Sequence, residues 1–62
     1  MKRYWIVKYT RNGFEFPLFL YGTEAEMQDY CQSELGRIPA YSGATDAQVE
    51  AGKALRMKFY IV

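Results

Sequence analysis

The chain has 62 residues and a formal net charge of +1, with one cysteine and no histidine. These counts exclude an internal disulfide, a histidine-containing zinc site and nucleophilic catalysis with a histidine base. Half of the residues are hydrophobic and 18% are aromatic, which is typical of a folded domain rather than a disordered segment. We expect one complete small domain over residues 1–62 that gains extra stability from oligomerisation.

The N-terminal apolar run is interrupted at Lys8, which makes it too short for the hydrophobic region of a signal peptide. No stretch reaches the roughly 20 apolar residues that a membrane-spanning helix needs. The sequence therefore predicts a cytoplasmic protein without membrane contact.

An Asn12-Gly13 pair joins two apolar runs, which predict β-strands over Lys2–Thr10 and Phe14–Tyr21. Both turn residues accept the positive φ of a type I′ turn, and a two-residue loop sets the register of the hairpin. Because side chains alternate across a strand, one face is nearly all apolar and is the predicted core face. It carries Trp5, Val7, Tyr9, Phe14, Phe16, Leu18 and Leu20.

The opposite face of the hairpin mixes lysines with aromatic side chains. The last predicted strand, Arg56–Val62, contributes to this face if Met57, Phe59 and Ile61 point inward. The resulting outer sheet face is the candidate partner-binding surface, with Lys2, Tyr4, Ile6, Lys8, Phe19, Tyr21, Lys58 and Tyr60.

Thr23 followed by Glu26 forms a capping box, which predicts a helix over residues 23–35 that ends at Gly36. Apolar residues recur on one side of this helix at helical spacing. Cys31 is one of them, so we interpret it as a core residue rather than a nucleophile. The predicted core-facing set is Met27, Tyr30, Cys31 and Leu35.

The segment Arg37–Ala44 has the composition of a loop. Thr45 with Gln48 is a second capping box, which predicts a short helix over 46–54, although Gly52 weakens the helical pattern.

Pro17 has no N–H to donate, which favours an edge position for the second strand. The predicted fold is α+β, β-β-α-(short α)-β, with a three-stranded antiparallel or mixed sheet in the order 2-1-3. The main helix covers the core face. The last strand is expected antiparallel to the first strand and parallel to the second, although the short second helix could reverse that direction.

The segment from Glu24 to Glu34 holds four acids and no bases, so the helix side should be negative and the sheet side positive. Such a run usually forms a solvated helix face. The loop from Tyr41 to Thr45 precedes a helix N-terminus and is a weak candidate for an anion site. We therefore predict no catalytic, cofactor-binding or metal-binding residues, and no enzymatic activity.

Two functions remain for the outer sheet face. The first is a protein-interaction module, most simply a homodimer that also binds an unknown protein partner. The second is nucleic-acid binding, with lysines on phosphates and tyrosines stacking on bases. Burial of this face by a second copy or by the short helix is the structural alternative. The general appearance of the chain is similar to accessory proteins of bacteriophages and mobile elements, a resemblance that implies binding and inhibition of a larger host protein.

Overall fold

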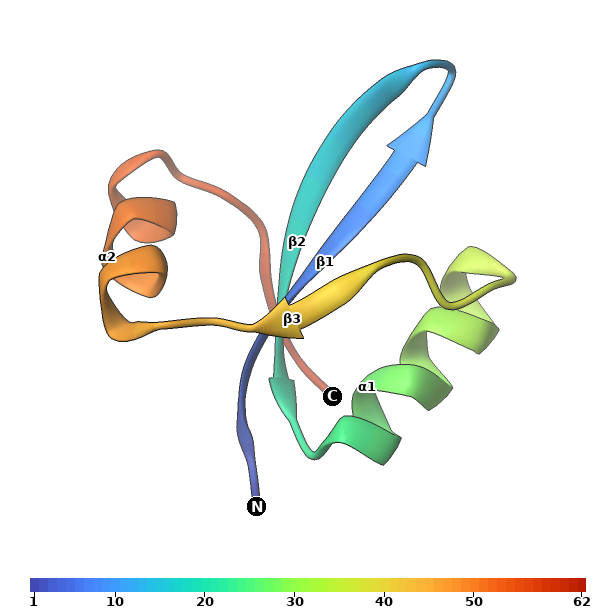
Figure 1. Cartoon of the computed structure of the whole chain (residues 1–62), viewed down its shortest axis with the longest axis horizontal. Coiled ribbons are helices and arrows are strands. Elements are labelled where there is room, and N and C mark those ends of the chain that lie inside the picture. The colour runs from blue at the N-terminus through green and yellow to red at the C-terminus, as the bar shows by residue number, and fades with distance from the viewer.

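The turn at Asn12 and Gly13 has φ values of 54° and 80° and joins β1 (Arg3–Arg11) to β2 (Phe14–Gly22). In this computed structural model, which describes residues 1–62, the two strands pair antiparallel over their whole length. The register is the one that the turn predicted, so the two faces of the hairpin are confirmed. Figure 1 shows the turn end of the hairpin projecting away from both helices.

Two three-residue strands complete the sheet, β3 (Tyr41–Gly43) and β4 (Phe59–Ile61). The strand order is β3-β1-β2-β4, with β3 antiparallel to β1 and β4 parallel to β2. The predicted three strands in the order 2-1-3 were therefore wrong, although the last strand does run parallel to the second. The cause is the segment predicted as a loop, which supplies β3 and occupies the free side of β1.

Pro17 does not make β2 an edge strand, which corrects the prediction, because β2 lies between β1 and β4. The backbone N–H of Phe19 donates to the carbonyl of Lys58 at 3.0 Å, and β4 pairs only with Phe19–Tyr21. Pro17 lacks the N–H that would continue this ladder. The half of β2 towards the turn therefore keeps an unpaired side.

The first helix begins and ends where its sequence signals lie. It comprises α1 (Glu24–Tyr30) and a π-helical segment η1 (Cys31–Leu35), followed by Gly36 in the left-handed conformation at φ 76°. Thr23 and Glu26 form the predicted capping box, in which each side chain accepts a hydrogen bond from the other residue's backbone N–H. The Thr23 hydrogen bonds, from its backbone first and its hydroxyl second, hold the pKa of Glu26 below its usual value.

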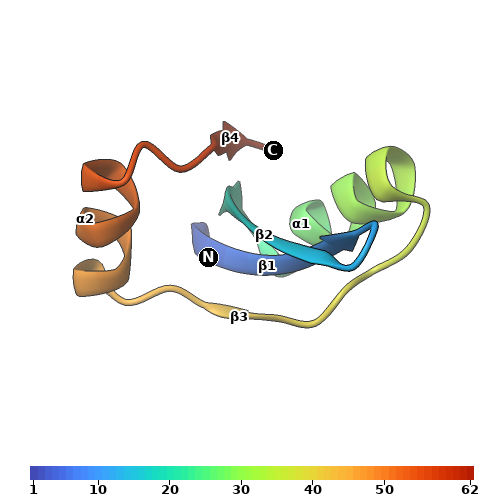
Figure 2. The ribbon, with the colours of Figure 1, turned by 90° about the horizontal axis from the view of Figure 1, so that it is seen from above.

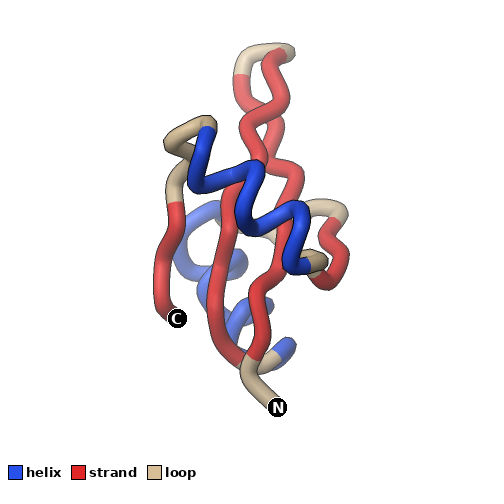
Figure 3. The backbone as a smooth tube through the Cα atoms, turned by 90° about the vertical axis from the view of Figure 1, so that its left-hand side faces the viewer, coloured by secondary structure: helices blue, strands red, loops and turns tan.

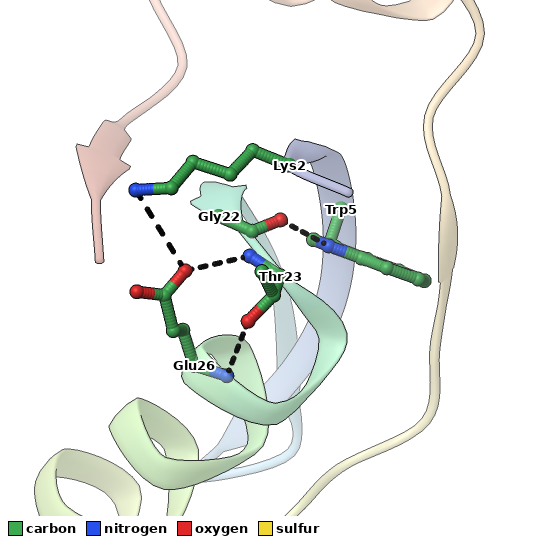
Figure 4. Close-up of polar contacts among 5 residues, drawn as sticks. All are labelled: Lys2, Trp5, Gly22, Thr23 and Glu26. Carbon is green, nitrogen blue, oxygen red and sulfur yellow. Dashed lines mark hydrogen bonds and ion pairs between the residues drawn. The ribbon is translucent and has the colours of Figure 1, made fainter.

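Polar contacts join the N-terminal part of the chain to the junction between β2 and α1 (Figure 4). The indole N–H of Trp5 donates to the carbonyl of Gly22 at 3.0 Å. Lys2 Nζ lies 3.9 Å from a Glu26 carboxylate oxygen. Both contacts lie where the chain leaves the sheet and enters the helix.

The main core lies between α1 with η1 and one face of the sheet. Val7, Leu20, Met27 and Cys31 are fully buried there. The predicted core roles of Met27 and Cys31 are confirmed. The half-buried hydrophobic residues around this cluster are Trp5, Leu18, Tyr30, Leu35, Tyr41 and Val62.

The second helix, α2 (Asp46–Ala54), has the predicted bounds and the predicted capping box at Thr45. It packs on the opposite face of the sheet from α1, with Gly52 buried against the Phe19 ring. The sheet therefore lies between two helices, as Figures 2 and 3 show. Neither helix has the length and apolar character needed to cross a membrane.

Candidate functional site

α2 covers the part of the outer sheet face around Phe19. Phe19 is only 4% exposed, and its ring stacks on that of Phe59 with the centroids 4.5 Å apart. A Cβ atom built on Gly52 would lie 2.7 Å from the Phe19 ring. Gly52, Phe19 and Phe59 therefore pack together on this side of the sheet. Phe19 is therefore buried by the second helix, which was one of the alternatives that the sequence left open.

The other predicted hairpin residues of this face are partly accessible. Tyr4 and Tyr21 are half-buried, with their ring centroids 4.8 Å apart. Ile6 is half-buried in a shallow depression beside α2. Lys2 reaches over the end of the sheet to α1, whereas Lys8 is exposed. The structure therefore brings the two tyrosines together but does not leave a continuous aromatic platform.

The faces of the last strand are exchanged relative to the prediction. Phe59 pairs with Phe19 and Tyr60 with Leu20. Because paired residues lie on the same face of a sheet, Phe59 belongs to the α2 side. Tyr60 and Lys58 belong to the α1 side, where both line one groove.

The end of α2 accounts for this exchange. Arg56 adopts a left-handed φ of 56°, and the N–H of Met57 donates to the carbonyl of Gly52. The conformation of this turn determines on which side of the sheet each side chain of the following strand lies. The predicted inward set of Met57, Phe59 and Ile61 was therefore wrong, and Ile61 is 85% exposed.

The predicted core face is covered only in part. Phe14 and Phe16 are 68% and 50% exposed, which corrects their assignment to the core. The helix has seven residues in α1 and five in η1, about 18 Å in length. Each hairpin strand has nine residues and spans about 30 Å. The helix is thus too short to cover the projecting end of the hairpin, a mismatch that the predicted element lengths already contained.

A groove of about 490 Å³ lies where this uncovered end meets the C-terminal end of the helix and the segment before β4. Three basic residues line it, and no acidic residue does. We call it the basic-aromatic groove, and its charged and aromatic residues are Arg11, Arg56, Lys58, Tyr9, Phe16, Tyr30 and Tyr60.

The aromatic rings of the groove come from three parts of the chain. Tyr9 and Phe16 are cross-strand partners in the hairpin. Tyr30 and Tyr60 stack with their centroids 6.1 Å apart and an interplanar angle of 28°. Burial, followed by the nearby charge of Glu34, raises the pKa of Tyr30. Like any tyrosine hydroxyl of ordinary or raised pKa, the Tyr30 hydroxyl is protonated at neutral pH and can donate a hydrogen bond.

Sequence reasoning found Lys58 and Tyr60 but placed them on the wrong face. Arg11 and Arg56 were missed as site residues, because they lie 45 positions apart and only the folded chain brings them to one groove. The hairpin pair Tyr9 and Phe16 was assigned to the core, since alternation alone does not say how far a helix extends over a sheet face.

The segment leading to α2, a candidate anion site in the sequence, begins with Tyr41, whose hydroxyl contacts the first helix. The Tyr41 hydroxyl donates to Glu24 at 2.7 Å and accepts from the Gln28 amide at 2.8 Å. The hydrogen bond to Glu24 raises the pKa of Tyr41. The start of this segment is therefore attached to α1.

Cys31 is fully buried, and burial raises the pKa of its thiol. We expect this thiol in the native protein to react with the disulfide reagent DTNB at least tenfold more slowly than in concentrated urea, because only the exposed thiolate reacts. The urea-unfolded protein is the control. A native reaction as fast as the unfolded one would contradict the core placement of Cys31.

These features define a small α+β domain with a four-stranded mixed sheet and two helices. No group of three or more histidine, cysteine, aspartate or glutamate side chains is placed to hold a metal ion. Comparison with known proteins finds no matching family, no matching curated protein and no matching solved structure.

Proposed function

We propose that this chain is a non-enzymatic protein-interaction module and that one of its partners is a second copy of itself. The observation that carries the proposal is the outer edge of β4. The carbonyl of Lys58 and the N–H of Val62 bond to β2. Because backbone groups alternate along a strand, those of Phe59 and Ile61 point away from β2. No strand pairs with β4 on that side (Figure 3).

This edge is complementary to itself. Two copies of β4 paired antiparallel about Tyr60 would place Phe59 of each copy opposite Ile61 of the other. Each such pair exchanges two backbone hydrogen bonds, and the exposed Ile61 side chain gains an apolar neighbour on the same face. Residues 59–62 carry no charge, proline or glycine, the features that usually block edge pairing.

The size of the core supports the same proposal. The main buried cluster contains only four residues. A domain of this length buries roughly 60% of its unfolded surface and is marginal in stability. Oligomerisation is a common way to strengthen such a small domain, and a single cysteine allows no internal disulfide.

Sedimentation velocity tests the edge. We expect the native chain to show a species of twice its 7.3 kDa mass at high protein concentration. Ile61→Lys should shift it to the monomer, because a charged side chain on the edge opposes pairing. Leu55→Lys is the matched control, since Leu55 is 74% exposed but lies at the end of α2.

A strictly monomeric native chain would overturn the self-association, and so would an Ile61→Lys variant that dimerises as well as the native chain.

The proposal extends to an accessory or inhibitory role in a bacteriophage or mobile element. Binding to a larger protein is supported by an exposed pair of phenylalanines, Phe14 and Phe16, at the projecting end of the hairpin, because aromatic anchors concentrate binding energy once desolvated.

A further inference from the structure

We propose that the basic-aromatic groove binds single-stranded nucleic acid, with its cations on phosphates and its aromatic rings stacked against bases. This inference goes beyond the proposed self-association and does not depend on it. It also differs from the surface that the sequence suggested for nucleic acid, because the groove lies on the α1 side of the sheet.

Charge is the first argument. Arg11, Arg56 and Lys58 line the groove without any acidic side chain. The ion pairs of the chain involve only Lys2 and Lys53, so the three groove cations are not neutralised within the protein. The net charge of +1 conceals this local excess, since four acids are concentrated on the first helix. An anionic ligand is therefore complementary to the groove.

The acids nearest in sequence to the groove residues, Glu15, Asp29 and Glu34, do not line it. Glu24 accepts the Tyr41 hydroxyl, and Glu26 caps its own helix. The charge of Glu34 contributes to the raised pKa of Tyr30, but Glu34 does not line the groove. The phosphate-binding side of the groove is therefore free of direct carboxylate competition.

Ring faces are the second argument. Two aromatic pairs line the groove, Tyr9 with Phe16 and Tyr30 with Tyr60. Phe16 is 50% exposed and Tyr60 is 41% exposed, so both offer surface for stacking. Stacking of bases on aromatic side chains tolerates any base, because every base has a π-face. A volume of about 490 Å³ is within the range of pockets that hold small ligands, large enough for one nucleotide unit.

The backbone beside the groove argues against an extended peptide as the occupant. Peptides that bind at a strand edge depend on main-chain hydrogen bonds. Along the unpaired half of β2, the backbone N–H and C=O groups of Phe14, Phe16 and Leu18 point towards β1. Those of Glu15 and Pro17 point outward, and Pro17 has no N–H. Recognition by side chains, as a nucleic acid requires, is the chemistry that remains.

Fluorescence anisotropy with a labelled twelve-nucleotide single strand, oligo(dT) or oligo(U), tests the inference. We expect binding at low salt that weakens as salt rises, with a log–log slope of about −2 for three phosphate contacts to a single strand. The double variant Arg11→Glu/Lys58→Glu should lose at least tenfold in affinity. Tyr60→Ala should lose about tenfold, because one stacking ring is removed.

Lys8→Glu is the matched control. Lys8 is exposed, does not line the groove and lies on the opposite face of the sheet. This variant changes the net charge as Lys58→Glu does, so it separates the groove from the outer sheet face. We expect less than a threefold loss. Circular dichroism of each variant confirms that the fold is retained, and Ile61→Lys shows whether binding needs the dimer.

Absence of single-strand binding at low salt would overturn the inference. Lys58→Glu alone should lose more than threefold in affinity, and equal losses from Lys8→Glu and Lys58→Glu would overturn the groove as the site. Equally tight binding of polyglutamate or of a DNA duplex would show general anion binding or duplex binding, and would likewise overturn the single-strand assignment. None of these outcomes bears on the self-association test, which measures mass without ligand.

Discussion

Replacing Leu20 with alanine is expected to lower the free energy of unfolding by about 2–5 kcal/mol. Leu20 of β2 is fully buried on the side of the sheet that the first helix covers, in one cluster with Val7, Met27 and Cys31. The loss combines the apolar transfer free energy of the removed atoms with the cavity that they leave. At about 0.05–0.15 kcal/mol per residue, a domain of 62 residues has little stability beyond that amount.

Urea unfolding followed by tryptophan fluorescence measures the effect, because Trp5 packs against the same cluster. Leu55→Ala is the control with the same chemical change. Leu55 is 74% exposed, so its replacement should stay within about 0.5 kcal/mol. Equal effects of the two substitutions would contradict the position of the core.

Replacing Gly52 with valine is expected to destabilise the chain by about 1–3 kcal/mol, although glycine is a poorer helix former than valine. A Cβ at this position would lie 2.7 Å from two atoms of the Phe19 ring and 3.1 Å from Phe59. Phe19 is buried and stacked on Phe59, so its ring has little room to move. The steric cost therefore exceeds the gain in helix propensity.

The double variant Gly52→Val/Phe19→Leu isolates this contact. The shorter leucine makes room for the added side chain, so the two substitutions together should cost less than the sum of each alone. Thermal unfolding of the four chains measures the coupling. A neutral or stabilising Gly52→Val, or strictly additive effects, would show that α2 does not pack on this face of the sheet.

Sequence signals gave correct predictions for features that depend on interactions between residues close together in the chain. The Asn12-Gly13 turn determines the hairpin register through its backbone conformation, and both capping boxes mark helix starts through hydrogen bonds between residues three apart. Burial of Cys31 followed from helical spacing alone. Each of these features depends on a few neighbouring residues, so no knowledge of the rest of the fold was needed.

The two short edge strands of the sheet could not be predicted in the same way. β3 and β4 have three residues each, too few for a periodic pattern. Their positions depend on which strand sides remain free and on how the chain leaves each helix. Pro17 illustrates the difficulty, because it limits the ladder between β2 and β4 without excluding a neighbour strand further along β2.

The hairpin, its register, both helices and the apolar face under the first helix were thus determined by the sequence itself, since short-range backbone and hydrogen-bond energetics specify them. Tertiary structure alone decided that α2 covers Phe19 on the outer face and that Tyr60 turns to the α1 side. It also brought Arg11 and Arg56 to one groove. These features depend on where packed elements are placed relative to one another, which no local pattern encodes.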